Sequence, residues 1–199
     1  MSDGGDGHPP DFDDAPFPEE DEILAGLEDV QLSPTEHQRL KDLVNDDLAG
    51  LKNYDRRYLV VGAGGTSGAA TRRMTVYDLL DARSNPPATA FRLEEYGLTP
   101  DDIRLWVRAF DILCGRASHI VAVIEDFDGS YVWEMGLIFA PGYRDKGWLL
   151  KRTYDDPEVE RERYDNGMAI SHVKLMLTGP RCQEWADTEE LQEAVAQIP

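Results

Sequence analysis

The residue best suited to chemistry is Glu134, which is the single charged side chain between Tyr131 and Ala140. So apolar a segment predicts a buried helix, and burying a carboxylate without partners costs several kcal/mol. A glutamate kept in the first turn of such a helix is therefore a candidate catalytic group. The alternative is that the helix dipole favours an acid there, but its contribution of about 0.3–1 kcal/mol is smaller than the burial cost.

A second set of candidates lies just before Glu134, in the loop 126–130. An ionised aspartate accepts hydrogen bonds without donating them, so Asp128 is a candidate to hold a sugar hydroxyl. Ser130 and Tyr131 are candidates to bind the same substrate, Tyr131 by stacking. Asp128 or Ser130 could instead cap the following helix, and the two roles are compatible.

A glycine-rich loop, 62–68, follows the apolar run 58–61. Small residues let backbone N–H groups approach a phosphate or ribose at the N-terminus of the next helix. The candidate binding residues are Gly62, Gly64, Gly65 and Thr66. The spacing is one residue too long for the dinucleotide fingerprint, and no P-loop lysine follows, so a plain strand-to-helix turn explains the loop equally well. Arg72 and Arg73 come next and could meet a phosphate, although solvated arginines are the commoner case.

Short apolar runs alternate with amphipathic segments along most of the chain. Strands are expected at 58–61, 88–93, 119–124, 147–150 and 173–177, and a closing helix at 188–198. This alternation predicts an α/β fold, a doubly wound, five-stranded parallel sheet of flavodoxin-like or Rossmann-like order 2-1-3-4-5. The run 119–124 is the most apolar, so we expect it at the centre of the sheet. Ligands are expected at the carboxyl ends of the strands.

The chain is expected to divide into three parts. Residues 1–32 contain eleven carboxylates and no lysine or arginine, a composition that predicts a disordered acidic tail. A capping box beginning at Ser33 starts an N-terminal helix over 33–52. The α/β domain follows over 53–199, and within it the charged stretch 151–171 is expected to be irregular, either a lid or an excursion.

The charge of the chain limits its partners. It has 39 acidic and 20 basic residues, a net charge of −19, so nucleic acid and anionic membrane surfaces are not expected as partners. We interpret the acidity as adaptation to a halophilic, archaeal cytoplasm. No run approaches the ~20 apolar residues of a membrane span, and no signal peptide is recognised, so the expected location is cytoplasmic.

Metal and cofactor sites are not predicted. No group of histidine, cysteine and carboxylate residues has metal-ligand spacing, and we expect no cofactor. Cys114 and Cys182 are expected to be reduced thiols. His119 and His172 are expected at the starts of strands, away from the candidate residues.

The segment 110–140 resembles the core of the nucleoside 2-deoxyribosyltransferase-like superfamily. The matching residues are Asp111, the strand 120–124, Asp128 with Gly129-Ser130, and Trp133-Glu134-Met135-Gly136. In that superfamily the glutamate of the last motif is the nucleophile on the sugar, so the resemblance implies this role for Glu134. The chain is also similar to uncharacterised haloarchaeal proteins built on this core, and more distantly to TIR-type NAD hydrolases, which have a catalytic glutamate on a related sheet.

Together these features predict a hydrolase or transferase that acts on the N-glycosidic bond of a nucleoside, nucleotide or NAD. Glu134 would attack the anomeric carbon while Asp128 orients the sugar. The expected partner is a small-molecule nucleoside or nucleotide, and a homo-oligomer is left open. Two alternatives stay open. One is a non-catalytic nucleotide-binding or regulatory module, because the loop 62–68 differs from the aromatic-rich loop of the superfamily. The other is a nicotinamide-dependent oxidoreductase, with Glu94 or Glu95 as the acid after the second strand.

Overall fold

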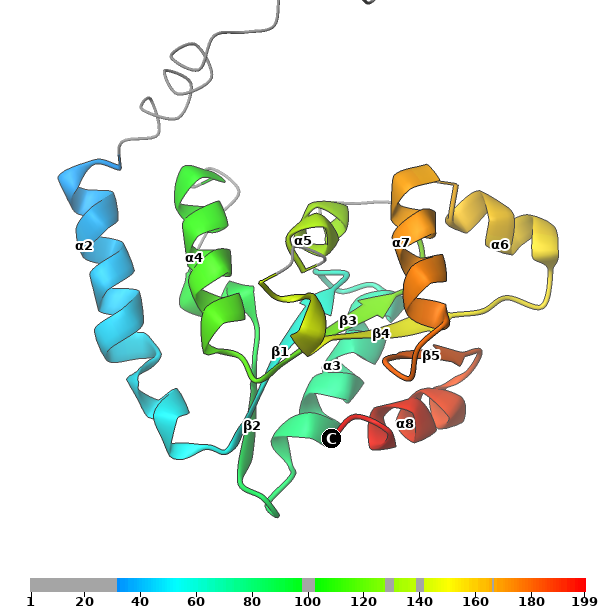
Figure 1. Cartoon of the computed structure of the whole chain (residues 1–199), viewed down its shortest axis with the longest axis horizontal. Helices are drawn as coiled ribbons and strands as arrows, with labels where there is room; N and C mark the ends of the chain where they lie inside the picture. The colour runs from blue at the N-terminus through cyan, green and yellow to red at the C-terminus, as the bar shows by residue number, and fades with distance from the viewer. Residues whose placement is uncertain (1–31, 98–102, 128–130, 139–141, 166) are drawn as a thin grey trace, which may run out of the picture.

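The computed structural model describes residues 32–97, 103–127, 131–138, 142–165 and 167–199. These residues form three layers, with one sheet between two layers of helices (Figure 1). The sheet has five strands in the order β2-β1-β3-β4-β5, and each neighbouring pair is parallel. The strands are β1 (Arg56–Gly62), β2 (Ala88–Phe91), β3 (His119–Ile124), β4 (Gly147–Arg152) and β5 (Cys182–Trp185). The predicted fold class, strand order and central strand are therefore confirmed.

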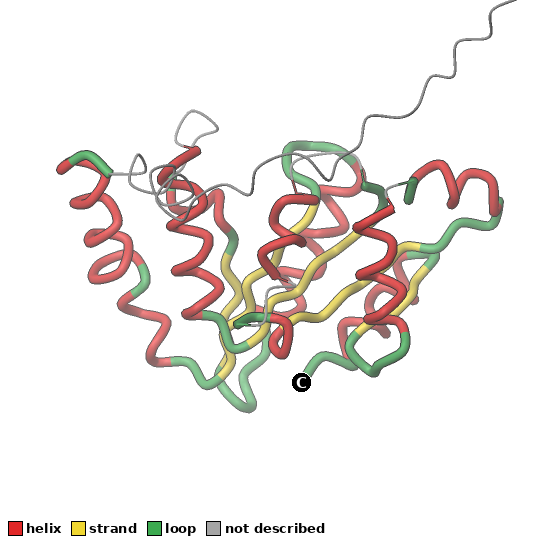
Figure 2. Tube along the Cα trace, turned by 45° about the horizontal axis from the view of Figure 1, so that its top comes forward, coloured by secondary structure: helices red, strands yellow, loops and turns green. Residues whose placement is uncertain are grey.

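The helices are divided between the two faces of the sheet. They are α2 (Pro34–Asp42), α3 (Gly68–Asp81), α4 (Ile103–Arg116), α5 (Tyr131–Ile138), α6 (Pro157–Arg163), α7 (Gly167–Leu177) and α8 (Thr188–Ala196). Helices α3 and α8 cover one face, α4, α5 and α7 cover the other, and α2 lies outside α4 (Figures 1 and 2). Among the helices of the described ranges, none has the length and hydropathy needed to cross a lipid bilayer.

The two helical layers pack on alternate side chains of the strands. Along β3, Ile120, Ala122 and Ile124 belong to the core beneath α4, α5 and α7, whereas Val121 and Val123 belong to the core beneath α3 and α8. Successive side chains of a strand point to opposite faces, so a strand covered on both sides must be apolar throughout. This requirement explains the continuous apolar run that marked β3 as the central strand.

The N-terminal helix begins as predicted. Ser33 caps α2 with a complete capping box, in which its side chain accepts from the Glu36 backbone N–H and the Glu36 carboxylate accepts from the Ser33 backbone N–H. The chain continues through a π-helical turn (Leu43–Asp47) and a 3₁₀ turn (Ala49–Asn53) before β1. The predicted segment 33–52 is thus helical throughout most of its length, although not one regular α-helix.

Two predictions about the C-terminal third are wrong. Residues 173–177 form the end of α7 and not a strand, and the fifth strand is Cys182–Trp185. In α7 the side chains that pack on the core recur at helical spacing, Ala169, Val173 and Met176. Strand β5 is at the edge of the sheet, and its two middle residues, Gln183 and Glu184, are not buried, so it carries no apolar run.

The stretch 151–171 is also more regular than predicted. Strand β4 extends to Arg152, and most of the remainder forms α6 and the first half of α7. Asp156 caps α6 by accepting from the Glu158 backbone N–H, and Pro157 takes the first helical position. As a consequence His172 lies within α7 and not at the start of a strand, whereas His119 does begin β3.

Candidate functional site

The candidate site lies where the strands end. All five strands are parallel, so their carboxyl ends meet at one edge of the sheet, which we call the carboxyl edge. The chain winds outward from β1 in one direction and from β3 in the other, so β1 and β3 flank the reversal point at which open α/β sheets bind ligands. Gly62 ends β1, Glu94 lies in a 3₁₀ turn shortly after β2, Glu125 follows β3 and Arg152 ends β4.

The glycine loop brings the backbone of β1 close to β3. Gly62 has φ +145°, and a Cβ at this position would lie 2.6 Å from the carbonyl oxygen of Val123. No side chain fits there. Ser67 then caps α3 by accepting from the Ala70 backbone N–H. The loop therefore makes the tight strand-to-helix turn that the sequence allowed.

The exposed part of the loop faces an acid that follows β2. Gly64, Gly65 and Thr66 are all exposed. A Cβ on Gly64 would lie 3.8 Å from Glu94 Oε1, so the loop backbone passes beside this carboxylate. The predicted binding residues Gly64, Gly65 and Thr66 are thus open to a ligand at the carboxyl edge, whereas Gly62 is buried in the turn beneath them.

Arg73 connects the glycine loop to this acid. Its side chain is buried, with Nη1 donating to the Gly62 carbonyl oxygen at 3.3 Å and Nη2 to Glu94 Oε1 at 2.5 Å. Its Nε has no hydrogen-bond partner within the described residues. The expectation that Arg73 is solvated is wrong, because the carboxylate of Glu94, in the 3₁₀ turn after β2, pairs with it.

Glu134 belongs to the same group of charges. Burial raises the pKa of Glu134 to about 7; the negative charge of Glu94 raises this pKa further and the positive charge of Arg73 lowers it. The charge of Glu134 in turn raises the pKa of Cys114 in α4, after the effects of burial and Asp111. Glu134, in the first turn of α5, is thus close enough to both α4 and the charges of the carboxyl edge to interact with them electrostatically. A carboxyl group with a pKa near 7 exchanges its proton at neutral pH, a property that clusters at functional sites.

A second charged cluster occupies the carboxyl edge on the α3 side. Glu125 is buried and accepts from Arg72 Nε at Oε1 (2.7 Å), from Arg72 Nη2 at Oε2, and from Arg152 Nη1 at Oε2 (2.8 Å). The hydroxyl of Tyr154 donates to the Glu125 backbone carbonyl at 2.6 Å. Arg72, like Arg73, is thus paired with a carboxylate, whereas the sequence suggested an arginine surrounded by solvent.

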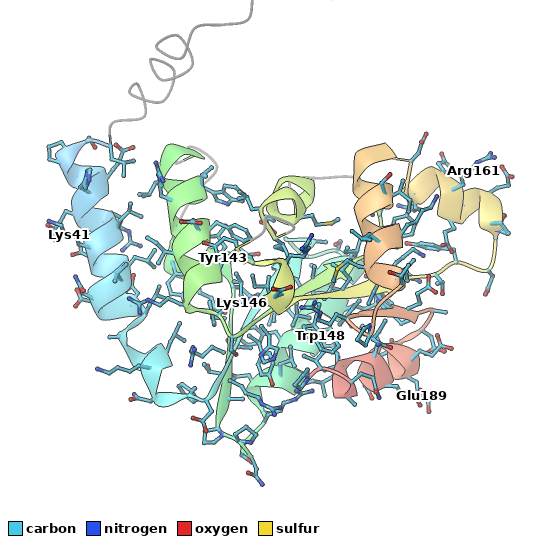
Figure 3. The ribbon with its side chains drawn as sticks, in the orientation of Figure 1. Lys41, Tyr143, Lys146, Trp148, Arg161 and Glu189 are labelled. Carbon is cyan, nitrogen blue, oxygen red and sulfur yellow. The ribbon has the colours of Figure 1, made fainter. Side chains whose placement is uncertain are left out.

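The opposite edge, where the strands begin, is called the amino edge. There Lys146 Nζ donates to the carbonyl oxygens of Cys114 (3.3 Å) and Ala117 (3.0 Å) at the end of α4, beneath the ring of Tyr143. Figure 3 shows Tyr143 and Lys146 close to this end of α4. The cation closes a helix C-terminus, whose last carbonyl groups lack partners within the helix.

Some of the predicted residues cannot be placed. Asp128 and Ser130 lie outside the described residues, and of Tyr131 only the backbone, the first residue of α5, is described. Within the described ranges, no group of three or more histidine, cysteine or acidic residues is positioned to hold a metal ion.

The sequence did not reveal three partners in these clusters. Glu94 was considered only as an acid for a nicotinamide cofactor, and Glu125 and Arg152 were not singled out. A signal was available for Glu125, because it directly follows the most apolar strand and a carboxylate there must lie at the carboxyl edge. No local signal identifies Arg152, since its pairing depends on the tertiary fold.

Comparison with protein-family models, curated proteins and solved structures found no match to this chain.

Proposed function

We propose that this chain hydrolyses or transfers at the N-glycosidic bond of a nucleoside, nucleotide or NAD, with the Glu134 carboxylate as the nucleophile. The observation that supports the proposal is the environment of Glu134. It is a largely enclosed carboxyl group, in the first turn of the helix that follows the central strand, with a pKa raised to about 7 by burial and by Glu94.

The raised pKa suits a nucleophile that works near neutral pH. At pH 7 about half of the Glu134 side chains are ionised, and the charge that forms is poorly solvated. A poorly solvated carboxylate gains more from bonding to an electron-deficient carbon than a hydrated one does. Arg73 opposes the rise in pKa, so it helps to maintain the ionised fraction.

The reaction takes place in two steps. In the first, a Glu134 oxygen forms a bond to the anomeric carbon while the bond from that carbon to the base nitrogen breaks. The bonding electron pair leaves with the base: a purine or pyrimidine takes a proton from solvent, whereas the nicotinamide of NAD, which is cationic while bound, leaves as a neutral molecule. In the second, water or the nitrogen of another base attacks the same carbon and releases Glu134 as a carboxylate, and the attacking group loses its proton to solvent. Asp128 is assigned, from the sequence alone, to hold a sugar hydroxyl.

The test is the release of free base from a panel of nucleosides, nucleotides and NAD in high salt. We expect at least one member to be cleaved, and Glu134→Gln to reduce kcat by about a thousandfold or more with substrate affinity largely retained. The control is Glu189→Gln, which removes one acidic charge from an exposed position on α8 (Figure 3). Binding of a nucleotide without base release by the wild type would replace the enzyme proposal with the binding-module alternative.

A further inference from the structure

The Glu125 cluster is not used by the reaction proposed above. A single buried carboxylate, 6% exposed, lies between two guanidinium groups. Both of its oxygens accept from arginine N–H groups, Oε1 from Arg72 and Oε2 from Arg72 and Arg152. Two positive charges against one negative charge leave an excess of one positive charge, in a chain whose net charge is −19.

Both arginines have donors to spare, and both reach solvent. The side chains of Arg72 and Arg152 are 26% and 28% exposed. Within the described part of the chain, Arg72 donates through Nε and Nη2 and Arg152 through Nη1, so Nη1 of Arg72 and Nη2 of Arg152 remain without a hydrogen bond. The Nε of Arg152 is buried and has no partner among the same residues.

Aromatic rings fix the orientation of the two guanidinium groups. The Cζ atoms of Arg72 and Arg152 lie 5.9 Å and 5.5 Å from the ring centroid of the buried Trp185, and Arg152 also lies 5.0 Å from that of Tyr154. Guanidinium groups stacked on aromatic faces lose little further freedom when their edges bind an oxyanion. The cluster is therefore preorganised for an anion.

The first turn of α3 lies beside the same donors. A Cβ on Gly68, the first residue of α3, would lie 3.3 Å from Arg72 Nη1, so this nitrogen is positioned over the beginning of the helix. The N-terminus of a helix carries a partial positive charge that adds to the excess charge of the arginines. Glycine at this position keeps the space beside Arg72 Nη1 clear of a side chain.

The cluster and Glu134 lie on opposite sides of the carboxyl edge. Side chains two residues apart lie on the same face of a strand, so Glu125, two residues after Val123, is on the α3 face. Glu134 belongs to α5, on the other face. Arg72 and Arg73 are consecutive residues of α3, and they bind the two clusters separately. A ligand that reached both clusters would cross the carboxyl ends of β1 and β3, at the reversal point of the sheet.

We infer that Arg72 and Arg152, held in place by Glu125, bind the phosphate monoester of the substrate, so that the chain acts on nucleotides in preference to unphosphorylated nucleosides. The identity of the bond that is cleaved rests on the proposed function, whereas the binding of phosphate by these arginines does not depend on it. A phosphate group would accept from Arg72 Nη1 and Arg152 Nη2, and its negative charge would offset the one excess positive charge of the cluster.

The experiment compares the binding of four nucleosides with that of their 5′-monophosphates, and of inorganic phosphate, at one ionic strength. Calorimetry measures the affinities. We expect at least one monophosphate to bind about 10- to 100-fold more tightly than its nucleoside, the range for hydrogen bonds to charged groups. Arg152→Gln should abolish that difference. Arg161→Gln should preserve it, because Arg161 is an exposed side chain on the outside of α6 (Figure 3).

The outcomes separate this inference from the proposed function. Phosphate-dependent binding without any release of base would support the phosphate site and contradict the glycosidase. Release of base with equal kcat/KM from nucleosides and monophosphates, unaffected by Arg152→Gln, would support the glycosidase and overturn the phosphate site. If Arg152→Gln does not fold, the wild-type comparison decides alone, because equal affinities for nucleosides and monophosphates overturn the inference.

Discussion

The two edges of the sheet use the same basic residue types in different ways. At the amino edge the cations donate to backbone carbonyl groups, as Arg57, Arg83 and Lys146 do. At the carboxyl edge they pair with carboxylates, as Arg72, Arg73 and Arg152 do with Glu125 and Glu94. These three amino-edge cations are thus held by backbone carbonyl groups, whereas the three carboxyl-edge arginines are held by carboxylates.

The difference follows from the direction of the helices. In a parallel α/β sheet the helices run opposite to the strands, so their C-terminal carbonyl groups collect at the amino edge and their N-terminal N–H groups at the carboxyl edge. A cation at the amino edge therefore finds acceptors in the helices themselves. A cation at the carboxyl edge lies near the positive ends of helices, so it needs a carboxylate as its partner. An anionic substrate can provide further negative charge. Removing the charge of Arg83 at the amino edge and removing the charge of Glu134 at the carboxyl edge should have effects of opposite sign on stability.

The largest effect on stability is expected at the amino edge. Arg83 donates to the hydroxyl of Tyr58 (3.0 Å) and to the carbonyl oxygens of Ile198 (2.8 Å) and Val195 (2.8 Å), and so connects α3 to the end of α8. Arg83→Gln should lower the free energy of unfolding by about 2–4 kcal/mol, because it removes several hydrogen bonds from a charged donor. Denaturant unfolding measures this loss, with Arg161→Gln as the control. Free-base release per folded molecule should not change, and a selective loss of activity would contradict the division between the edges.

At the carboxyl edge, removing a charge should stabilise the protein. The pKa of Glu134 is about 7 in the folded chain and about 4.5 in the unfolded reference, so the folded state binds more protons between these values. The preference of the folded state for protonated Glu134 therefore stabilises the protein fully below pH 4.5, and this stabilisation is lost as the pH rises through 7. Glu134→Gln should therefore be more stable than the wild type by up to about 3 kcal/mol at pH 8, and nearly equal to it at pH 4.5. Unfolding measured at both pH values tests this, and equal stability at pH 8 would show that Glu134 is not an enclosed charge.

A smaller effect is expected from the neighbour of Glu134. The charge of Glu94 raises the pKa of Glu134, and Glu94 also neutralises Arg73. Glu94→Gln removes the repulsion between the Glu94 and Glu134 carboxylates and leaves the positive charge of Arg73 without its partner, so the pKa of Glu134 should fall. The pH midpoint of free-base release should move to lower pH in this variant and stay in place in Glu189→Gln. An unchanged midpoint would mean that Glu94 and Glu134 do not interact.

The smallest effect is expected from the N-terminal segment. Residues 1–32 combine many carboxylates with few apolar side chains, so the sequence predicts that they add little to the stability of the domain. Deleting them should leave the thermal midpoint at high salt unchanged within error. A large fall in the midpoint would show that this segment packs on the domain.

The sequence predicted the fold better than the site. The strand β3 is covered on both faces, so its six residues carry an apolar pattern that only a central parallel strand needs. The edge strand β5 is covered less completely, and its polar middle residues conceal it. The apolar residues of α7 were mistaken for a strand because Val173 to Leu177 is too short a window to distinguish the two periods.

The candidate site could be predicted only where a residue is anomalous in its own segment. Glu134 meets this condition, since it is a charge in an apolar helix. Arg72 and Arg73 do not, because consecutive arginines in a helix look the same whether they are solvated or paired. Their carboxylate partners come from the turns after β2 and β3, and only the strand order brings these turns together with α3.

The most direct test of the central claim is the pH dependence of kcat/KM for free-base release by the wild type between pH 5 and pH 9. This quantity follows the ionisation of groups in the free enzyme. If Glu134 is the ionised nucleophile, kcat/KM should rise about tenfold per pH unit at low pH and level off above a midpoint near 7. A rate that falls above pH 7, as for a proton donor, or a profile that is flat through this range, would contradict the account.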